Sequence, residues 1–200
     1  MKDPYNVIIT GVGGQGNVLA ARMLGNIMAI KGCNVTIGET FGASQRGGSV
    51  MSHLRISDKT VFSPQIPKGQ ADLVVALEPI ESLRVMAGYG NMNVKVLSNT
   101  RSIYPVGVIC GEQNYPSLDE IKQSLEGLCG EMHFIPATDE AVKLGHAILG
   151  NVMMIGAVAG LGVLPFDEND FEKVLRGNVS ESKIAINMTA FRAGMEMVKK

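Results

Sequence analysis

Residues 11–16 read Gly11-Val12-Gly13-Gly14-Gln15-Gly16, a glycine-rich turn of the form G-x-G-x-x-G. An apolar run at residues 6–10 precedes the turn, and a helical pattern begins near residue 17. A strand, a glycine turn and a helix in this order build a βαβ unit whose free N–H groups and helix N-terminus face an anion. The alternative is a tight turn that packs helix on strand without a ligand. The stretch therefore predicts a Rossmann-like start and leaves both alternatives open.

The following segments first keep this pattern and then break it. Apolar residues recur at helical spacing over residues 17–31, at Leu19, Met23, Ile27 and Ile30. A second strand at residues 35–37 leads to Glu39, close to where a dinucleotide fold places the acid that binds a ribose hydroxyl. Residues 41–49 are then polar and glycine-rich, and residues 50–56 alternate like a strand. Together with a short return strand at Val61-Phe62, they predict a β-hairpin inserted beside the parallel sheet.

The rest of the chain indicates one α/β domain. Near-continuous apolar runs predict strands at residues 72–77, 94–97 and 132–135. Helices are predicted at residues 80–86 and, after a capping box of Ser117 and Glu120, on a face shared by Leu118, Ile121, Leu125 and Leu128. Helix signals after Thr138 cover residues 139–147, 151–161, 168–176 and 181–198, with Gly156 and Gly160 spaced for close helix contact. We expect a single domain over residues 1–200: an open, mainly parallel Rossmann-like sheet at about 5–136 and a helical C-terminal cap at about 138–200.

Composition excludes several functional classes. A formal net charge of −1 without a run of Lys and Arg argues against nucleic acid as a partner. The three cysteines are far apart and form no C-x-x-C pair, which argues against a metal or iron–sulfur site held by this chain alone. The most apolar stretch, residues 152–164, is too short to span a bilayer, and the N-terminal apolar run is too short for a secretory signal. We therefore expect a cytoplasmic protein that does not use a membrane.

Two further segments are candidates for a functional site. Ser44-Gln45-Arg46-Gly47-Gly48-Ser49 places an arginine beside glycines, which exposes its guanidinium and nearby amides to a carboxylate, a phosphate or a partner surface. We favour a ligand or interface role over a solvated loop, and expect Arg46→Ala to leave the fold intact while impairing assembly or turnover. Asn151 heads an apolar helix, where it either caps the helix or contacts a neighbouring loop or ligand.

The sequence offers no arrangement of side chains that indicates catalysis. His53, His133 and His146 lie on different elements and are expected to be structural, and no Ser/His/Asp or Cys/His set is indicated. We therefore predict no catalytic residue and no metal ligand. The candidates for cofactor binding or subunit contact are Gly11, Gly13, Gly14, Gln15, Gly16, Ser44, Gln45, Arg46, Gly47, Gly48 and Asn151.

Several motifs in order resemble the gamma-type domain of the 2-oxoacid:ferredoxin oxidoreductases. They are residues 11–16, 44–50, 55–58, 71–79 and 151–161, so that the similarity covers nearly the whole chain. The run Ser44 to Val50, with Phe62-Ser63-Pro64 and Ala76-Leu77-Glu78-Pro79, looks most like the small beta subunit of the indolepyruvate branch of that family.

The resemblance implies one subunit of an enzyme that oxidatively decarboxylates a 2-oxoacid, makes an acyl-coenzyme A and passes electrons to ferredoxin. It implies that thiamine diphosphate and the iron–sulfur clusters reside on a large partner subunit, with coenzyme A as a co-substrate of the complex. In agreement, the sequence has no G-D-G followed by paired asparagines. The isolated chain is expected to be inactive, to expose an apolar surface and to self-associate. The alternatives are a free-standing dinucleotide-binding reductase that uses Gly11 to Gly16 and Glu39, and a purely structural assembly subunit.

Overall fold

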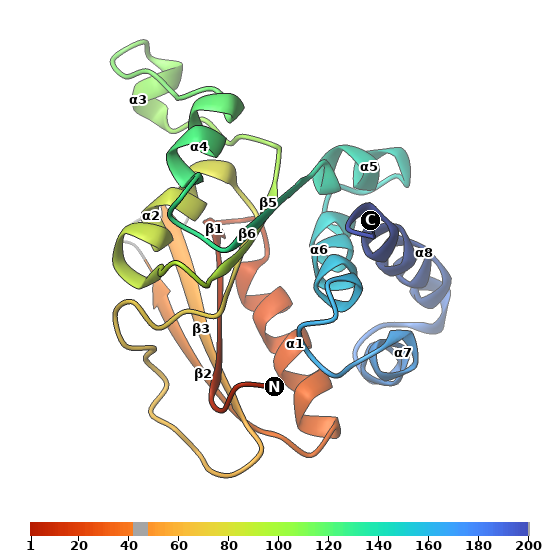
Figure 1. The fold of residues 1–200 in the computed structure, drawn as a ribbon. Coiled ribbons are helices and arrows are strands. Elements are labelled where there is room, and N and C mark those ends of the chain that lie inside the picture. The colour runs from red at the N-terminus through yellow and green to blue at the C-terminus, as the bar shows by residue number, and fades with distance from the viewer. Residues whose placement is uncertain (42–47, 200) are drawn as a thin grey trace.

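The computed structural model describes residues 1–41 and 48–199. A six-stranded sheet runs through the molecule, and helices pack on both of its faces (Figure 1). The strands are β1 (Tyr5–Val12), β2 (Asn34–Phe41), β3 (Ser49–Ser57), β4 (Leu73–Ala76), β5 (Lys95–Asn99) and β6 (Glu131–Ile135). The helices are α1 (Asn17–Ile30), α2 (Pro79–Tyr89), α3 (Val106–Ile109), α4 (Leu118–Leu125), α5 (Ala137–Lys143), α6 (Leu149–Gly160), α7 (Glu168–Arg176) and α8 (Glu181–Met197).

The strand order is β2-β3-β1-β4-β5-β6. Strands β1, β4, β5 and β6 are parallel, whereas β3 is antiparallel to both of its neighbours, β2 and β1. Strand β2 therefore runs in the same direction as β1, and only β3 is reversed. The predicted mainly parallel α/β class is confirmed.

The inserted hairpin is built differently from the prediction. Strand β3 pairs with β2 and lies between β2 and β1, so that Ser52 faces Glu39 on one side and Ile9 on the other. The predicted return strand at Val61-Phe62 is wrong, because residues 58–72 form a loop. Arg55 on β3 holds that loop across the sheet: its guanidinium lies 4.6 Å from the centre of the Phe62 ring, and its Nη1 donates to the Ser63 carbonyl at 3.2 Å.

Alternating side chains of the central strands fill two separate cores. Val7 and Ile9 of β1 face the core beneath α1, α6, α7 and α8, whereas Ile8 faces the core beneath α2 and α4. In β4, Val75 and Val74 divide between the two cores in the same way. Burial on both faces explains why these strands read as continuous apolar runs in the sequence.

Glycines bring α6 and α8 into direct backbone contact. A Cβ atom on Gly156 would overlap the carbonyl oxygen of Phe191 on α8, and one on Gly160 would lie 2.6 Å from the carbonyl oxygen of Met195. Gly194 on α8 fits in the same way against the Met153 carbonyl of α6. The close contact predicted from the spacing of Gly156 and Gly160 is confirmed.

Some apolar positions of the predicted helical patterns are exposed. Leu19 and Ile30 of α1 are each 52% exposed, because Ala20, Leu24 and Ile27 face the sheet in their place. Leu128, expected on α4, is also 52% exposed, since that helix ends at Leu125. No helix in the described ranges 1–41 and 48–199 is long and apolar enough to cross a membrane.

Candidate functional site

The candidate site lies where the direction of the chain crossings reverses. From β1 the chain crosses through α1 to β2 on one side, and from β4 it crosses through α2 to β5 on the other. Ligands of open α/β sheets bind outside the carboxyl ends of the strands at such a switch point. A cavity of about 190 Å³ lies at this place, lined in part by Gly14 and Gln15 of the glycine turn, Asn99 after β5 and Asn151 of α6.

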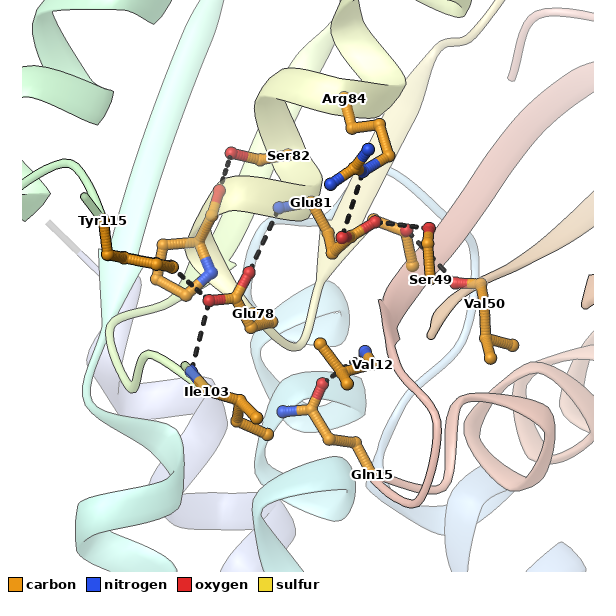
Figure 2. Close-up of polar contacts among 12 residues, drawn as sticks. Val12, Gln15, Ser49, Val50, Glu78, Glu81, Ser82, Arg84, Ile103 and Tyr115 are labelled. Atoms are coloured by element: carbon orange, nitrogen blue, oxygen red, sulfur yellow. Dashed lines mark hydrogen bonds and ion pairs between the residues drawn. The ribbon is translucent and has the colours of Figure 1, made fainter. Parts of the chain in front are cut away.

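The glycine turn is closed around the protein's own polar groups. Gly14 and Gly16 have φ angles of 102° and 83°, in the left-handed region that favours glycine. The N–H of Gly13 donates to the carbonyl of Gly48 at 2.8 Å. The Gln15 side chain folds back, so that its Oε1 accepts from the Val12 N–H at 2.7 Å (Figure 2). Its Nε2 donates to the Leu77 carbonyl at 2.9 Å. The N–H groups of Val12, Gly13 and Gln15 thus have partners within the chain, whereas no side-chain hydrogen bond caps the start of α1.

Two asparagines secure the turn from other directions. Asn17 Nδ2 donates to the Val12 carbonyl at 3.1 Å, and Asn151 Nδ2 donates to the Gln15 carbonyl at 2.7 Å. Of the two alternatives for Asn151, the polar contact to a neighbouring loop is therefore the one observed, because α6 begins two residues earlier, at Leu149. Whether Asn151 also contacts a ligand or a subunit stays a prediction.

Glu39 is poorly placed for the ribose of a dinucleotide. Because β3 separates β2 from β1, Glu39 lies two strands from the glycine turn, roughly 10 Å across the sheet rather than about 5 Å. Its carboxylate is 3.6 Å from Nε of Arg22 on α1. The geometry therefore does not favour a dinucleotide bound in the Rossmann manner.

Other polar groups of the cavity were not predicted as site residues. Asn99 donates through Nδ2 to the Leu77 carbonyl at 3.1 Å and to Oγ1 of Thr138 at 2.9 Å. Arg101 also lines the cavity, and its Nη1 donates to the Asp139 carboxylate at 2.8 Å. The signal in the sequence is the polar stretch directly after β5, since the ends of parallel strands meet at the ligand-binding edge of a sheet.

The chemistry of the cavity is that of polar recognition. Its lining offers amide groups, a hydroxyl group and one guanidinium, and none of its described lining residues is Asp, Glu, His or Cys. Such a set can orient a polar or anionic group but supplies no general base.

The buried carboxyl group of Glu78 accepts hydrogen bonds from residues on both sides of α3 (Figure 2). Glu78 follows β4 and is fully buried. Its Oε2 accepts from the Glu81 N–H at 3.2 Å, and its Oε1 accepts from the Ile103 N–H at 3.3 Å and from the Tyr115 hydroxyl. Burial raises the pKa of Glu78 above its ordinary value, against the hydrogen bonds, which lower it. Burial and the contact with Glu78 likewise raise the pKa of Tyr115.

The neighbouring Glu81 anchors the start of β3. Its Oε2 accepts from the Ser49 hydroxyl at 2.5 Å, and its Oε1 accepts from Arg84 Nε at 3.1 Å (Figure 2). Ser49, bonded to Glu81, and Gly48, bonded to Gly13, are the last two residues of the candidate segment Ser44 to Ser49. These bonds hold the end of that segment beside the glycine turn. The candidates Ser44, Gln45, Arg46 and Gly47 lie outside the described residues.

Two of the three histidines have structural partners, as expected. His53 is buried, its Nδ1 accepts from the Ile66 N–H at 3.4 Å, and burial lowers its pKa. His133 lies 2.8 Å from the Glu131 carboxylate. His146 is exposed beside a groove between α1, α6 and α8. Among the residues that the structure describes, no three His, Cys, Asp or Glu side chains are grouped to hold a metal ion.

Comparisons with known proteins identify relatives of this chain. The family model for pyruvate ferredoxin/flavodoxin oxidoreductase matches residues 6–197. The indolepyruvate oxidoreductase subunit IorB of Thermococcus kodakarensis is 37% identical over 196 residues, which cover 98% of this chain and 96% of that protein.

Two solved structures have the same fold. Pyruvate oxidoreductase subunit PORC from Thermotoga maritima has a TM-score of 0.73 at 21% identity, over 98% of this chain and 97% of that one. The 2-oxoglutarate:ferredoxin oxidoreductase from Magnetococcus marinus has a TM-score of 0.76 at 21% identity, over 99% of this chain and 31% of that one.

The match of the family model and the identity to the archaeal relative, both over nearly the full length, show that the chain belongs to the pyruvate ferredoxin/flavodoxin oxidoreductase family.

Proposed function

We propose that this chain is the small, non-cluster-binding subunit of a 2-oxoacid:ferredoxin oxidoreductase that acts on indolepyruvate or a related aryl-pyruvate. The observation that carries the proposal is the end-to-end identity of 37% to an indolepyruvate oxidoreductase subunit. A site that offers polar contacts without a general base agrees with a subunit that completes an enzyme rather than one that performs the chemistry alone.

The reaction requires groups that this chain does not supply. The complex converts a 2-oxoacid and coenzyme A to an acyl-coenzyme A, carbon dioxide and a proton, and passes two electrons to ferredoxin in the cytoplasm. Thiamine diphosphate supplies the carbanion chemistry and iron–sulfur clusters carry the electrons, both on the large partner subunit. Cys33, Cys110 and Cys129 are free and lie on separate parts of the fold, so they do not fit a four-cysteine cluster.

We assign the carboxyl edge of the sheet, with the cavity beside it, to contact with the active site of the complex. The structure from Magnetococcus marinus, which shares the fold, was solved with 2-oxoglutarate, coenzyme A and succinyl-CoA bound. Arg101 and the amides of Asn99 and Asn151 suit a contact with an anionic group of coenzyme A or of the partner's active site. This assignment distinguishes the proposal from a purely structural assembly subunit.

Reconstitution tests the function. The chain and the large subunit, purified separately, should show coenzyme A-dependent reduction of ferredoxin by indolepyruvate only after mixing. Pyruvate and 2-oxoglutarate should give a lower kcat/KM than indolepyruvate. If the two chains co-purify but oxidise no 2-oxoacid, the proposed oxidoreductase activity is excluded. Binding of NAD(P)H or flavin by the isolated chain would favour the alternative of a free-standing reductase.

Substitution within the cavity tests whether this chain reaches the active site. Asn99→Ala and Arg101→Ala should raise the KM for coenzyme A or lower kcat while the complex still forms. If both variants assemble and turn over like the wild type, this chain is a structural subunit only.

A further inference from the structure

A groove of about 680 Å³ runs between α1, α6 and the start of α8. Its floor is apolar, with Ala20 and Met23 from α1, Val152 and Ile155 from α6 and Ile186 from α8. Ile148 and Asn151 line both this groove and the smaller cavity at the glycine turn. The groove is therefore continuous with the candidate site but lies on the helical side of it.

The rim of the groove is unusually apolar for a surface. Leu19 and Ile148 both line it, and they are 52% and 51% exposed. Lys183 adds a positive charge, whereas none of the described lining residues is Asp or Glu. An apolar floor with a cationic edge is complementary to an amphipathic segment that carries acidic residues along its border.

The polar groups of the groove are not arranged to hold a small molecule. Small-ligand pockets use a few convergent polar groups to fix orientation. Here Asn178 Nδ2 donates to the Val174 carbonyl at 2.7 Å, and Asn187 Nδ2 donates to the Lys183 carbonyl at 2.8 Å. Both amides donate within their own helical segments, so the groove presents mainly apolar surface.

We propose that this groove seats an amphipathic helical segment of the large subunit, with apolar side chains on the floor and an acidic residue facing Lys183. The inference rests on the proposed function, because that function supplies the partner. Continuity with the candidate site means that a segment in the groove also fixes the position of Asn151 and the glycine turn relative to the partner's active site.

The chain offers a matched pair of substitutions for the test. Leu19 and Ile30 lie on the same helix and are each 52% exposed, but only Leu19 lines the groove. Eleven residues separate them, which is about 16 Å along the helix and about 20° around it. Leu19→Asp should weaken binding to the large subunit by about 10- to 100-fold, whereas Ile30→Asp should change it less than about 3-fold.

A second pair tests the other rim. Ile148→Asp should weaken binding as Leu19→Asp does, whereas Val142→Asp on α5, where Val142 is 56% exposed, should not. Lys183→Glu should lower the affinity most at low ionic strength, since salt screens an exposed charge pair. Affinities are measured by titrating fluorescently labelled chain with large subunit, and circular dichroism melts show that each variant is folded.

The outcomes separate this inference from the function on which it rests. Failure of the wild-type chain to bind the large subunit overturns both. Wild-type binding with equal affinities for Leu19→Asp and Ile30→Asp overturns the groove and leaves the function standing. Loss of self-association in Leu19→Asp, with unchanged binding to the large subunit, would assign the groove to a second copy of this chain instead.

Discussion

At the scale of single residues, Gly16 is the position where the glycine turn tolerates a side chain least. Its φ of 83° disfavours any other residue, and an added Cβ would collide with the Asn151 amide. We expect Gly16→Ala to lower the free energy of unfolding by about 2–3 kcal/mol, from backbone strain of about 1–2 kcal/mol and the lost hydrogen bond of Asn151, about 1 kcal/mol. Urea unfolding followed by circular dichroism measures the change.

Gly32 supplies the control for that substitution. It has a similar φ of 87°, but nothing lies within 4 Å of an added Cβ. Gly32→Ala should therefore cost only the backbone strain, about 1–2 kcal/mol. In an Asn151→Ala background, Gly16→Ala should cost no more than Gly32→Ala does. Equal losses for the two glycine variants in the wild-type background would mean that Asn151 does not confine the turn.

Glu78 predicts a pH dependence of stability with a definite sign. Its folded-state pKa is raised by burial above the ordinary 4.5, so the unfolded chain ionises first as the pH rises. The contribution of Glu78 is greatest below pH 4.5 and is lost as the pH rises through the folded-state pKa. The free energy of unfolding of wild type minus that of Glu78→Gln should therefore fall from pH 4 to pH 8.

Glu120 provides a comparison of opposite sign. It is exposed at the start of α4, and hydrogen bonds from Ser117 lower its pKa. Its contribution is present above the ordinary value of 4.5 and is lost as the pH falls through the lower folded-state pKa, so the difference between wild type and Glu120→Gln should rise with pH. A flat difference curve for Glu78→Gln would show that its carboxyl is not perturbed.

At the scale of elements, the crossing of α6 and α8 reverses a general rule. Gly→Ala in a helix interior ordinarily stabilises by about 0.5–1 kcal/mol. At Gly156 and Gly194 the added Cβ would overlap backbone of the opposite helix, so each substitution should instead destabilise by about 3 kcal/mol or more. Gly88→Ala near the end of α2, where nothing lies within 4 Å, should be neutral or stabilising. Thermal melts of the three variants decide between the two signs.

The sequence predicts elements well where the determining contacts are local. The predicted capping box of Ser117 with Glu120 places the start of α4 and is confirmed, and the predicted start of α7 at residue 168 is confirmed as well. The predicted start of α8 at residue 181 is also confirmed, although no side-chain hydrogen bond caps this helix. The short helix α3 was not predicted, because its four residues are too few to show a periodic pattern.

Prediction from the sequence fails where the determining contacts link residues that are distant along the chain. Strand β3 was predicted as a strand, but its place between β2 and β1 depends on pairing that no local pattern records. The contact between Asn151 and Gln15 joins residues 136 positions apart, so the helix start alone could not distinguish it from a cap. Leu19 shares the helical spacing of Met23 and Ile27 but is exposed, because periodicity alone does not distinguish a solvent-facing leucine from a buried one.

At the scale of the whole molecule, apolar side chains gather on surfaces that none of the described residues covers. Leu19 and Ile148 border the groove, and Tyr104, Val106 and Ile109 lie on the excursion around α3, which projects from the body (Figure 1). We expect the isolated chain to self-associate in the micromolar range, because such patches are rarely left in contact with water.

Sedimentation velocity over a range of concentrations measures that association. The weight-average mass should rise with concentration for the isolated chain, and addition of the large subunit should replace the self-associated species with a defined complex. A chain that stays monomeric at high concentration would contradict the expectation that its surface is built for a partner.

The reversed strand β3 has a consequence for protein engineering. Point substitutions at the glycine turn can free its amides from Gln15, but they cannot bring Glu39 next to β1 while another strand lies between. To design a nucleotide-binding enzyme on this scaffold, one would have to delete β3 and reconnect β2 directly to the sheet. That deletion also removes Arg55, which holds the loop over residues 58–72, and Ser49, which is joined to Glu81. Conversion to a nucleotide-binding enzyme therefore requires a change of topology, and a library limited to substitutions would not contain it.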